Sequence, residues 1–374
     1  MKNSKIITVI AKPTHDCNLN CKYCYLDKDV EKGKMSDQLL AQAIQKVSDF
    51  AESSHWIWHG GEPLLMGTDF YRLIKEIQEN YKKKGKQFFN SIQTNGTLIT
   101  SDLIEFCRQT KDFHIGVSID GPEELHNKTR IYSGGNGSFK DVIKGRELLK
   151  DKGIGSGAIC VINLNNIDYP QKLYSFFKSE KINVKFNPLI KSGRALDNLS
   201  ELGITPKQYG DFLLKLWKIY NKDVEREGRL TIDIDPFMEV IGNLGTNRPL
   251  GCNYSISCRD SFISIGPEGD IYPCGRFDGI KEFWMGNIKQ DTVEEAVNSK
   301  INIKLKERSL ENVTGCSECN FGKICNSGCI HNAYCNGNTF GKDPYCSSYK
   351  MLFSEMKKVL NSESYLKGGL KNEN

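Results

Sequence analysis

Cysteine placement constrains this chain more than any other feature of its sequence. Fourteen cysteines occur in 374 residues, and eleven of them fall into two groups. The first group is Cys17, Cys21 and Cys24, which follow an apolar run at Ile6–Ala11 and are separated by three and two residues. Iron–sulfur clusters normally take four cysteine ligands, so three thiolates at this spacing predict a four-iron cluster with one iron open to a small molecule.

The first half of the chain alternates strand-like runs with amphipathic helical stretches. We expect strands at 6–11, 56–58, 88–93, 114–119, 158–162 and 184–188, and helices at 37–50, 69–84, 101–110, 139–151 and 168–178. Six such units predict parallel strands joined by right-handed crossovers. A closed eight-unit barrel needs about 250 residues. The expected fold class is therefore α/β, with a partial (β/α)6 barrel over residues 1–190.

Polar and glycine-containing motifs follow the predicted strands at one end. The sequence Gly60-Gly61-Glu62 follows the second strand, Asn95 follows the third and Ser118 follows the fourth. The carboxyl ends of parallel strands meet at one rim, where barrel enzymes build their sites. We therefore expect these residues to form one site with the cysteine loop.

The density of cysteine rises again beyond residue 251. This second group comprises Cys252, Cys258, Cys274, Cys316, Cys319, Cys325, Cys329 and Cys346. Residues 262–272 alternate around a Gly-Pro-Glu-Gly turn and predict a β-hairpin, and residues 291–307 predict a helical spacer. Cysteine spacing alone does not separate zinc from iron, so a non-catalytic zinc scaffold is an open alternative.

Four segments follow from these patterns. Residues 1–190 form the barrel, 191–250 a bridging segment with a long helix at 206–227, 251–350 a small cysteine-rich domain with a hairpin and helices, and 351–374 a C-terminal helix and tail.

The overall charge bounds the possible partners. A net charge of +5 fits an anionic ligand or an acidic peptide, but it is too small to indicate nucleic acid. No apolar run approaches the roughly 18 residues of a membrane span, and the N-terminal residues lack a signal-peptide pattern. We expect a cytoplasmic protein without a nucleic-acid or membrane partner.

Together these motifs resemble the radical S-adenosylmethionine (SAM) enzymes that carry a SPASM, or twitch, auxiliary domain. The resemblance implies that the cluster held by Cys17, Cys21 and Cys24 binds SAM at its open iron. The implied SAM contacts are Tyr23 and Leu189 at the adenine, Gly60, Gly61 and Glu62 at the methionyl amine, and Ser118 and Arg130 at the ribose and carboxylate, with Asn95 assigned to the same rim.

The resemblance also implies two auxiliary [4Fe–4S] clusters, and so three in all. It assigns the inner one to Cys252, Cys258, Cys274 and Cys329, and the outer one to Cys316, Cys319, Cys325 and Cys346. Of the remaining cysteines, Cys107 and Cys160 fit buried core positions. Three roles are possible for Cys335: a loop residue without a function, a hydrogen-atom donor in catalysis or a replaceable cluster ligand.

Two subgroups of this family are similar to the chain, the anaerobic sulfatase maturases and the maturases of ribosomally made peptides. Sulfatase maturases carry an aspartate base directly after the third auxiliary cysteine, where this chain has Gly275. A glycine cannot accept a proton, and Asp278 is the nearest possible substitute. The sequence Trp58-His59-Gly60-Gly61 is similar instead to that of cyclophane-forming peptide maturases.

The reaction implied by the resemblance begins with cleavage of SAM to a 5′-deoxyadenosyl radical. The radical takes a hydrogen atom from a precursor peptide, which then forms an intramolecular C–C (cyclophane) or thioether crosslink. A formylglycine-forming sulfatase maturase and a peptide epimerase are the alternatives.

The implied partners are the precursor peptide and an electron donor such as flavodoxin or ferredoxin. Only five residues precede the first predicted strand. We therefore expect no fused leader-binding domain, and leader recognition by the groove itself or by a separate protein.

Overall fold

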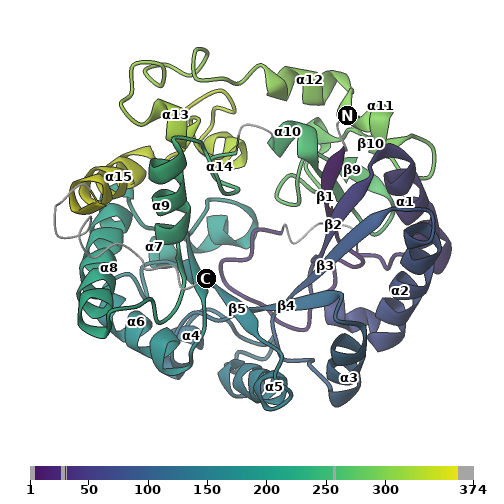
Figure 1. Cartoon of the computed structure of the whole chain (residues 1–374), viewed down its shortest axis with the longest axis horizontal. Helices are drawn as coiled ribbons and strands as arrows, with labels where there is room; N and C mark the ends of the chain where they lie inside the picture. Colours follow the sequence, from purple (N-terminus) through teal and green to yellow (C-terminus); the bar gives the residue numbers. More distant parts are fainter. Residues whose placement is uncertain (1–4, 27–29, 31, 256–257, 361–374) are drawn as a thin grey trace.

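The computed structural model describes residues 5–26, 30, 32–255 and 258–360. One ten-stranded sheet curves into an open barrel with helices on its outer face (Figure 1). The strand order is β10-β9-β8-β1-β2-β3-β4-β5-β6-β7. The predicted α/β class with a partial barrel is confirmed.

Six parallel strands and the helices between them form the barrel. The strands are β1 (Ile6–Ala11), β2 (Ser53–Trp58), β3 (Gln87–Thr94), β4 (Phe113–Ser118), β5 (Ser156–Ile162) and β6 (Val184–Pro188). The helices are α1 (Asp37–Phe50), α2 (Thr68–Lys82), α3 (Ser101–Thr110), α4 (Glu123–His126), α5 (Phe139–Asp151) and α6 (Pro170–Ser179), with a 3-10 turn η1 (Pro63–Met66).

Helix α1 illustrates how the sequence sets these elements. The Ser36 hydroxyl accepts a hydrogen bond of 3.2 Å from the backbone N–H of Leu39, so the helix begins with a side-chain cap. Leu40, Ile44 and Val47 recur at helical spacing and are fully buried. The apolar face packs inward while the polar face meets solvent.

The segment between residues 191 and 250 connects the barrel to the cysteine-rich segment, and it also adds a strand to the sheet. It contains η2 (Gly193–Asn198), α7 (Leu199–Leu202), α8 (Pro206–Glu227), β7 (Ile234–Asp235) and α9 (Phe237–Thr246). Strand β7 pairs in parallel with β6, in the register Val184 to Ile234. Helix α8 begins with a capping box between Thr205 and Gln208 and packs against α6 and the last helix, α15 (Cys346–Leu360). The predicted domain limits at 190, 250 and 350 stay predictions.

The cysteine-rich segment joins the opposite edge of the same sheet. Strand β8 (Phe262–Ile265) lies parallel to β1, and β9 (Asp270–Tyr272) and β10 (Gly286–Asn287) follow antiparallel, so the hairpin forms where it was expected. The remaining elements are α10 (Cys258–Ser261), η3 (Lys281–Phe283), α11 (Val293–Val297), α12 (Lys300–Lys306), α13 (Gly322–Cys325) and α14 (Ile330–Cys335).

One expected helix is wrong in extent. Residues 291–307 form two helices, because the Ser299 hydroxyl accepts a hydrogen bond from the backbone N–H of Asn302 and begins a new helix. Cys107 and Cys160 are buried, at 4% and 0% exposure, as predicted. Among the described residues, no helix combines the length and apolarity needed to cross a bilayer.

Candidate functional site

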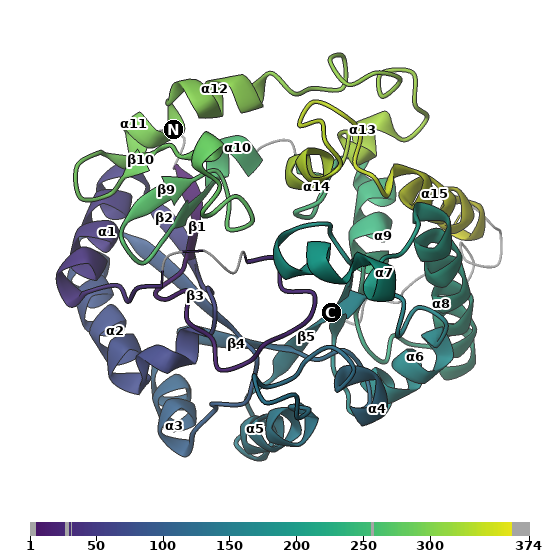
Figure 2. The same cartoon turned by 180° about the vertical axis from the view of Figure 1, so that it is seen from behind.

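The first cysteine loop leaves β1 and crosses the mouth of the barrel (Figure 2). Backbone hydrogen bonds hold it there. Asn20 N–H donates to Ile131 O at 2.7 Å, and Lys22 N–H donates to Thr129 O at 2.9 Å. A second part of the chain, the loop after β6, also holds the cysteine loop: Arg194 N–H donates to the carbonyl of Cys24 at 2.9 Å.

The two glycines after β2 lie against the backbone of this loop. A Cβ atom on Gly60 would lie 2.3 Å from Thr14 O, and one on Gly61 would lie 2.1 Å from Asp16 O. Gly61 N–H donates to Thr14 O at 2.9 Å, and Glu62 N–H donates to Asp16 O at 2.8 Å. The glycines are required because the backbones approach this closely.

Replacing Gly61 with alanine should therefore displace the first cysteine loop. We expect the Gly61→Ala protein to lose about a third of its iron, the four irons of one cluster in three, together with SAM cleavage. Gly134 is the matched control, since no atom of a described residue lies within 4 Å of a Cβ placed there. Iron analysis of both variants checks this, and equal iron in the two would contradict it.

Most of the predicted SAM contacts line one cavity beside the cysteine loop, which is called the SAM cavity below. The cavity is lined by Cys17, Cys21 and Cys24 and by six of the eight predicted contacts: Tyr23, Gly60, Gly61, Asn95, Ser118 and Arg130. Four different strand ends contribute these residues, as expected for a site on the carboxyl rim.

Glu62 is placed differently from the expectation. Its side chain is fully buried and does not line the cavity. The carboxylate accepts hydrogen bonds from Leu64 N–H at 3.0 Å, Thr94 Oγ1 at 2.6 Å and Asn95 N–H at 2.7 Å. Burial raises the pKa of Glu62 to about 7 even though these donors lower it. The carboxylate thus ties the loop after β2 to the end of β3, and its contact with the methionyl amine stays a prediction.

Leu189 does not line the cavity, and its predicted contact with the adenine stays a prediction. Its side chain is 2% exposed and packs in a small cluster with Tyr23, Ala195 and Leu202. Pro188 and Ile190, its neighbours in sequence, line the cavity in its place. Leu189 therefore supports Tyr23 from behind.

Asp120 is a functional residue that the sequence reasoning missed. It is fully buried, and its carboxylate accepts hydrogen bonds from Arg130 Nε at 3.0 Å, Thr129 Oγ1 at 3.3 Å and Val161 N–H at 2.9 Å. The hydroxyl of Tyr23 also donates to it. One carboxylate thus positions two predicted SAM contacts. Its place in the Ser-Ile-Asp-Gly motif at the end of β4 was the available signal.

Arg130 lies in the cavity wall with its charge balanced. Burial lowers the pKa of Arg130, but Asp120, Tyr23 and the thiols of Cys21 and Cys160 together raise it above its ordinary value. The guanidinium carbon lies 5.4 Å from the centre of the Tyr23 ring. Arg130 is 7% exposed and is therefore not a solvated surface charge.

His126 connects this network to the stability of the fold. The side chain is fully buried between Asp120 N–H, at 3.3 Å, and the Ser138 hydroxyl, at 3.0 Å. Burial lowers the pKa of His126 to about 3. An unfolded histidine takes up its proton near pH 6.5. The unfolded chain therefore binds more protons below that pH, and acid favours unfolding.

We expect His126 to make the protein less stable at pH 5.5 than at pH 7.5. The contribution is about 1.4 kcal/mol per pH unit below the unfolded pKa. In urea unfolding, the His126→Gln protein should lose about 1.4 kcal/mol less than the parent between these pH values. The exposed His114→Gln variant should keep the parental dependence. Equal dependence in all three proteins would contradict the assignment.

The inner auxiliary ligands come from four places in the chain and influence one another. Burial, together with the neighbouring thiols of Cys329 and Cys252, raises the pKa of Cys258 to about 11 and that of Cys274 to about 12. Such mutual influence requires neighbouring thiols. The set assigned to the inner cluster is thus gathered in one region.

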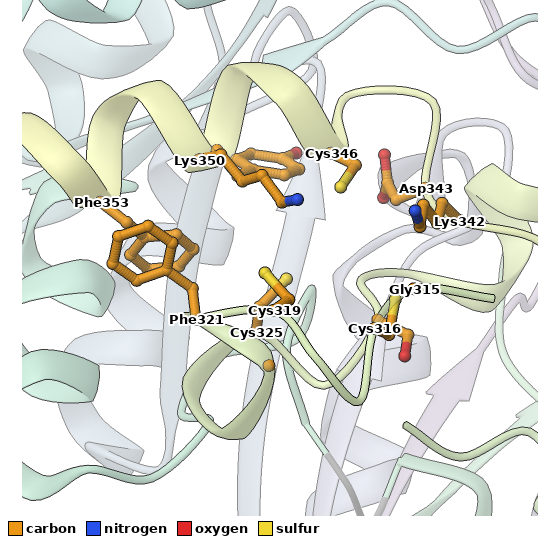
Figure 3. A pocket seen from close by; sticks show the side chains of 13 residues that line it. Gly315, Cys316, Cys319, Phe321, Cys325, Lys342, Asp343, Cys346, Lys350 and Phe353 are labelled. Carbon is orange, nitrogen blue, oxygen red and sulfur yellow. The ribbon is translucent and has the colours of Figure 1, made fainter. Parts of the chain in front are cut away.

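The outer auxiliary ligands line a cavity of their own. Cys316, Cys319, Cys325 and Cys346 surround it, together with Lys342, Asp343 and Lys350. Figure 3 shows the sulfurs of Cys319, Cys325 and Cys346 facing one another across this space.

The four outer auxiliary thiols surround their cavity and are not grouped around a single point. Within the part of the chain that the structure describes, no three Cys, His, Asp or Glu side chains are grouped to hold one metal ion. A zinc ion would draw four sulfurs to about 2.3 Å from one centre. Four thiols around a cavity fit a four-iron cluster, which has a volume of its own.

Cys335 is not a loop residue. It is the last residue of α14, and its Sγ lies 3.6 Å from Nε2 of His331. Burial raises the pKa of Cys335 to about 11. His331 lines the SAM cavity, whereas Cys335 does not. The roles of hydrogen-atom donor and replaceable ligand stay hypotheses.

Comparison with known proteins places this geometry in a class. The sequence model of the Radical SAM superfamily matches residues 11–177. That of the SPASM iron–sulfur cluster-binding domain matches residues 257–320. The chain is therefore a radical SAM enzyme with a SPASM domain, and its cofactors are SAM and three [4Fe–4S] clusters.

Two relatives narrow the class. A cysteine-type anaerobic sulfatase-maturating enzyme of Clostridium novyi is 30% identical over 361 residues, covering 94% of this chain and 95% of the relative. A serine-type enzyme of Bacteroides thetaiotaomicron is 34% identical over 358 residues, covering 88% and 84%. This chain belongs to the radical SAM and SPASM family that includes the anaerobic sulfatase-maturating enzymes.

Solved structures agree with this assignment. Native anSMEcpe with bound AdoMet and the Kp18Cys peptide has a TM-score of 0.85 at 27% identity, covering 95% of this chain and 98% of that one. Streptococcus suis SuiB bound to its precursor peptide SuiA has a TM-score of 0.66 at 16% identity, covering 91% and 75%, and so shares the fold.

Proposed function

We propose that this chain is a maturase of ribosomally made peptides that oxidises one residue and joins it to a neighbouring side chain by a C–C or thioether bond. The observation that carries the proposal is the composition of the SAM cavity. Its lining includes the cluster ligand Cys21 on the barrel side, and Arg276 and His331 from the SPASM side. A peptide side chain in this cavity would lie between the first cluster and the inner auxiliary ligands.

The protein's own contribution is to position the reactants and exclude water. When bound, SAM and a reduced first cluster would supply the 5′-deoxyadenosyl radical that takes one hydrogen atom from the peptide, and the auxiliary clusters would accept the second electron as the second hydrogen leaves as a proton. Asp120 fixes Tyr23 and Arg130 in the cavity wall. Holding two reacting groups on one restrained peptide favours ring closure.

Sulfatase maturation is the second candidate, and sequence similarity favours it. The two relatives are 30% and 34% identical over nearly their full length. The site chemistry favours the crosslink. No Asp or Glu is present among the described residues that line the cavity. A Cβ atom on Gly275 would lie 2.7 Å from Cγ2 of Ile10, so a side chain at this position requires the Ile10 side chain to move.

Asp278 does not replace the missing base in this arrangement. Its side chain is 2% exposed and pairs with Lys12 Nζ at 3.3 Å and His15 Nε2 at 3.5 Å. It lines a neighbouring cleft and not the SAM cavity. An ion pair of this kind holds the SPASM hairpin against the end of β1.

The test is an anaerobic reaction with SAM, dithionite and two peptides. One is encoded by the small open reading frame next to the gene, and the other contains Cys-x-Pro-x-Arg. We expect the first to lose two hydrogen atoms and to show a block of missing fragment ions in tandem mass spectrometry. Conversion of the second to an aldehyde, trapped by a hydrazine reagent, with no change in the first, would establish sulfatase maturation.

An electron donor such as flavodoxin or ferredoxin and a separate leader-binding protein belong to this proposal. Pull-down from the native host with the precursor peptide present tests both.

A further inference from the structure

The SAM cavity contains an arginine that pairs with no Asp or Glu side chain of the described residues. Arg276 lies two residues after Cys274 and lines the cavity from the SPASM side. One of its nitrogens donates to Asn332 Oδ1 at 2.9 Å. In the part of the chain that the structure describes, it forms no ion pair with an Asp or Glu side chain. A guanidinium has five N–H donors, so donors are left for a ligand.

The other cations near the cavity differ from Arg276 in this respect. Arg130 pairs with Asp120 at 3.0 Å. Lys12, which is fully buried and lies 5.2 Å from the centre of the Tyr25 ring, pairs with Asp278 at 3.3 Å. Both charges are therefore paired with a carboxylate. Among the described residues Arg276 has no such partner, and the groups that interact with its charge include the thiols of Cys329, Cys252 and Cys274.

A second donor is present in the same cavity. Gly60 N–H donates to Nδ1 of His59 at 2.8 Å. A backbone N–H can only donate, so Nδ1 carries no proton and the neutral ring has its N–H at Nε2. His59 lines the cavity with Arg276. A guanidinium and an imidazole N–H form a donor set that suits a carboxylate.

Arg130 and Arg276 lie on separate sides of the cavity, so each is placed to bind a different anion: the carboxylate of SAM or a group on the substrate. Arg130 belongs to the barrel wall and contacts Tyr23, one of the predicted SAM contacts. Arg276 belongs to the segment that carries the inner auxiliary ligands. The carboxylate of SAM is expected on the barrel side, which leaves Arg276 for a group on the substrate.

We propose that Arg276, with His59 as a second donor, binds an Asp or Glu side chain of the peptide close to the residue that is oxidised. This inference rests on the proposed function, because it names the substrate class of the same cavity. Two other anions could occupy Arg276: the carboxylate of SAM, and the inner auxiliary cluster with its thiolate ligands.

The test is an anaerobic selection of binding peptides. A random dodecapeptide library made by mRNA display is selected on the cluster-loaded, SAM-loaded enzyme and on its Arg276→Gln, Arg276→Lys and Arg72→Gln variants. Arg72 is an exposed arginine of α2 and is the matched control. We expect the parent and Arg72→Gln to enrich Asp or Glu at one fixed position by about tenfold, as a charged hydrogen bond provides.

The variants should respond according to charge. Arg276→Gln should lose the acidic preference while still enriching peptides, and Arg276→Lys should keep part of it. The affinity for SAM should change less than about threefold in Arg276→Gln, since losing a charged hydrogen bond costs tenfold or more.

Four results would overturn the inference. Peptides enriched without an acidic position, or an acidic preference that persists in Arg276→Gln, would remove the subsite. A loss of SAM affinity of about tenfold would assign Arg276 to SAM. An unchanged selection with a shifted reduction potential of the inner cluster would assign it to that cluster. Enrichment of no peptide at all would overturn the proposed function itself.

Discussion

Replacing Cys21 with alanine is expected to abolish formation of 5′-deoxyadenosine and to remove about a third of the bound iron. The first site has three thiolates, so its cluster cannot keep its place with two. The eight auxiliary cysteines lie in other parts of the chain and keep their clusters. About eight of about twelve irons should therefore remain. Iron analysis and chromatography of the anaerobic reaction measure both effects.

The matched control is Cys107→Ala. Cys107 is 4% exposed in α3 and packs in the core of the barrel. Its loss removes a small buried side chain, so stability falls by about 1 kcal/mol while iron content and SAM cleavage stay at parental levels. Equal iron loss in the two variants would contradict the assignment of the first site.

Replacing Asp120 with alanine is expected to lower the free energy of unfolding by about 3–5 kcal/mol, because it leaves Arg130 buried and unpaired. The Arg130 and Asp120 side chains are 8% and 0% exposed. The same change frees Tyr23, so the affinity for SAM should fall as well. Urea unfolding and SAM titration of the reconstituted protein measure the two effects.

Asp112→Ala is the control for this prediction. Asp112 pairs with Lys75 and Lys82, but the side chains of the trio are about a quarter exposed. Water screens such pairs, so the cost should stay within about 1 kcal/mol. If Asp120→Ala costs no more than Asp112→Ala, the network around Arg130 is not what holds the cavity wall.

Local sequence patterns predicted the barrel well. The bounds of β1, α1, α3, α5, β6 and α8 agree with the predicted ranges. In α1, capping by Ser36 and the helical spacing of Leu40 and Ile44 both point to the same element. Where propensity, pattern and capping agree, the sequence specifies the element.

The long-range pairings could not be predicted. Strand β8 lies parallel to β1, with Thr8 opposite Phe262, although about 250 residues separate them. Strand β7 contains two residues, too few to show an alternating pattern. The edges of a sheet depend on tertiary contacts that no local pattern records.

The site was predicted to the level of motifs but not of side-chain direction. Glu62 and Asp120 both lie in polar motifs at strand ends, but only Glu62 was predicted to be a site residue, and Asp120 was missed. The charge of each residue says nothing about its partners. Glu62 binds the neighbouring loop, whereas Asp120 binds Arg130 and Tyr23. Burial and hydrogen-bond partners, which decide these roles, become visible only in three dimensions.

The most direct test is to measure 5′-deoxyadenosine after adding SAM and dithionite to anaerobically purified, reconstituted protein of known metal content. A protein with about twelve irons that releases deoxyadenosine is the predicted result. A protein that contains zinc in place of iron, or that carries its iron and releases no deoxyadenosine, would contradict the account.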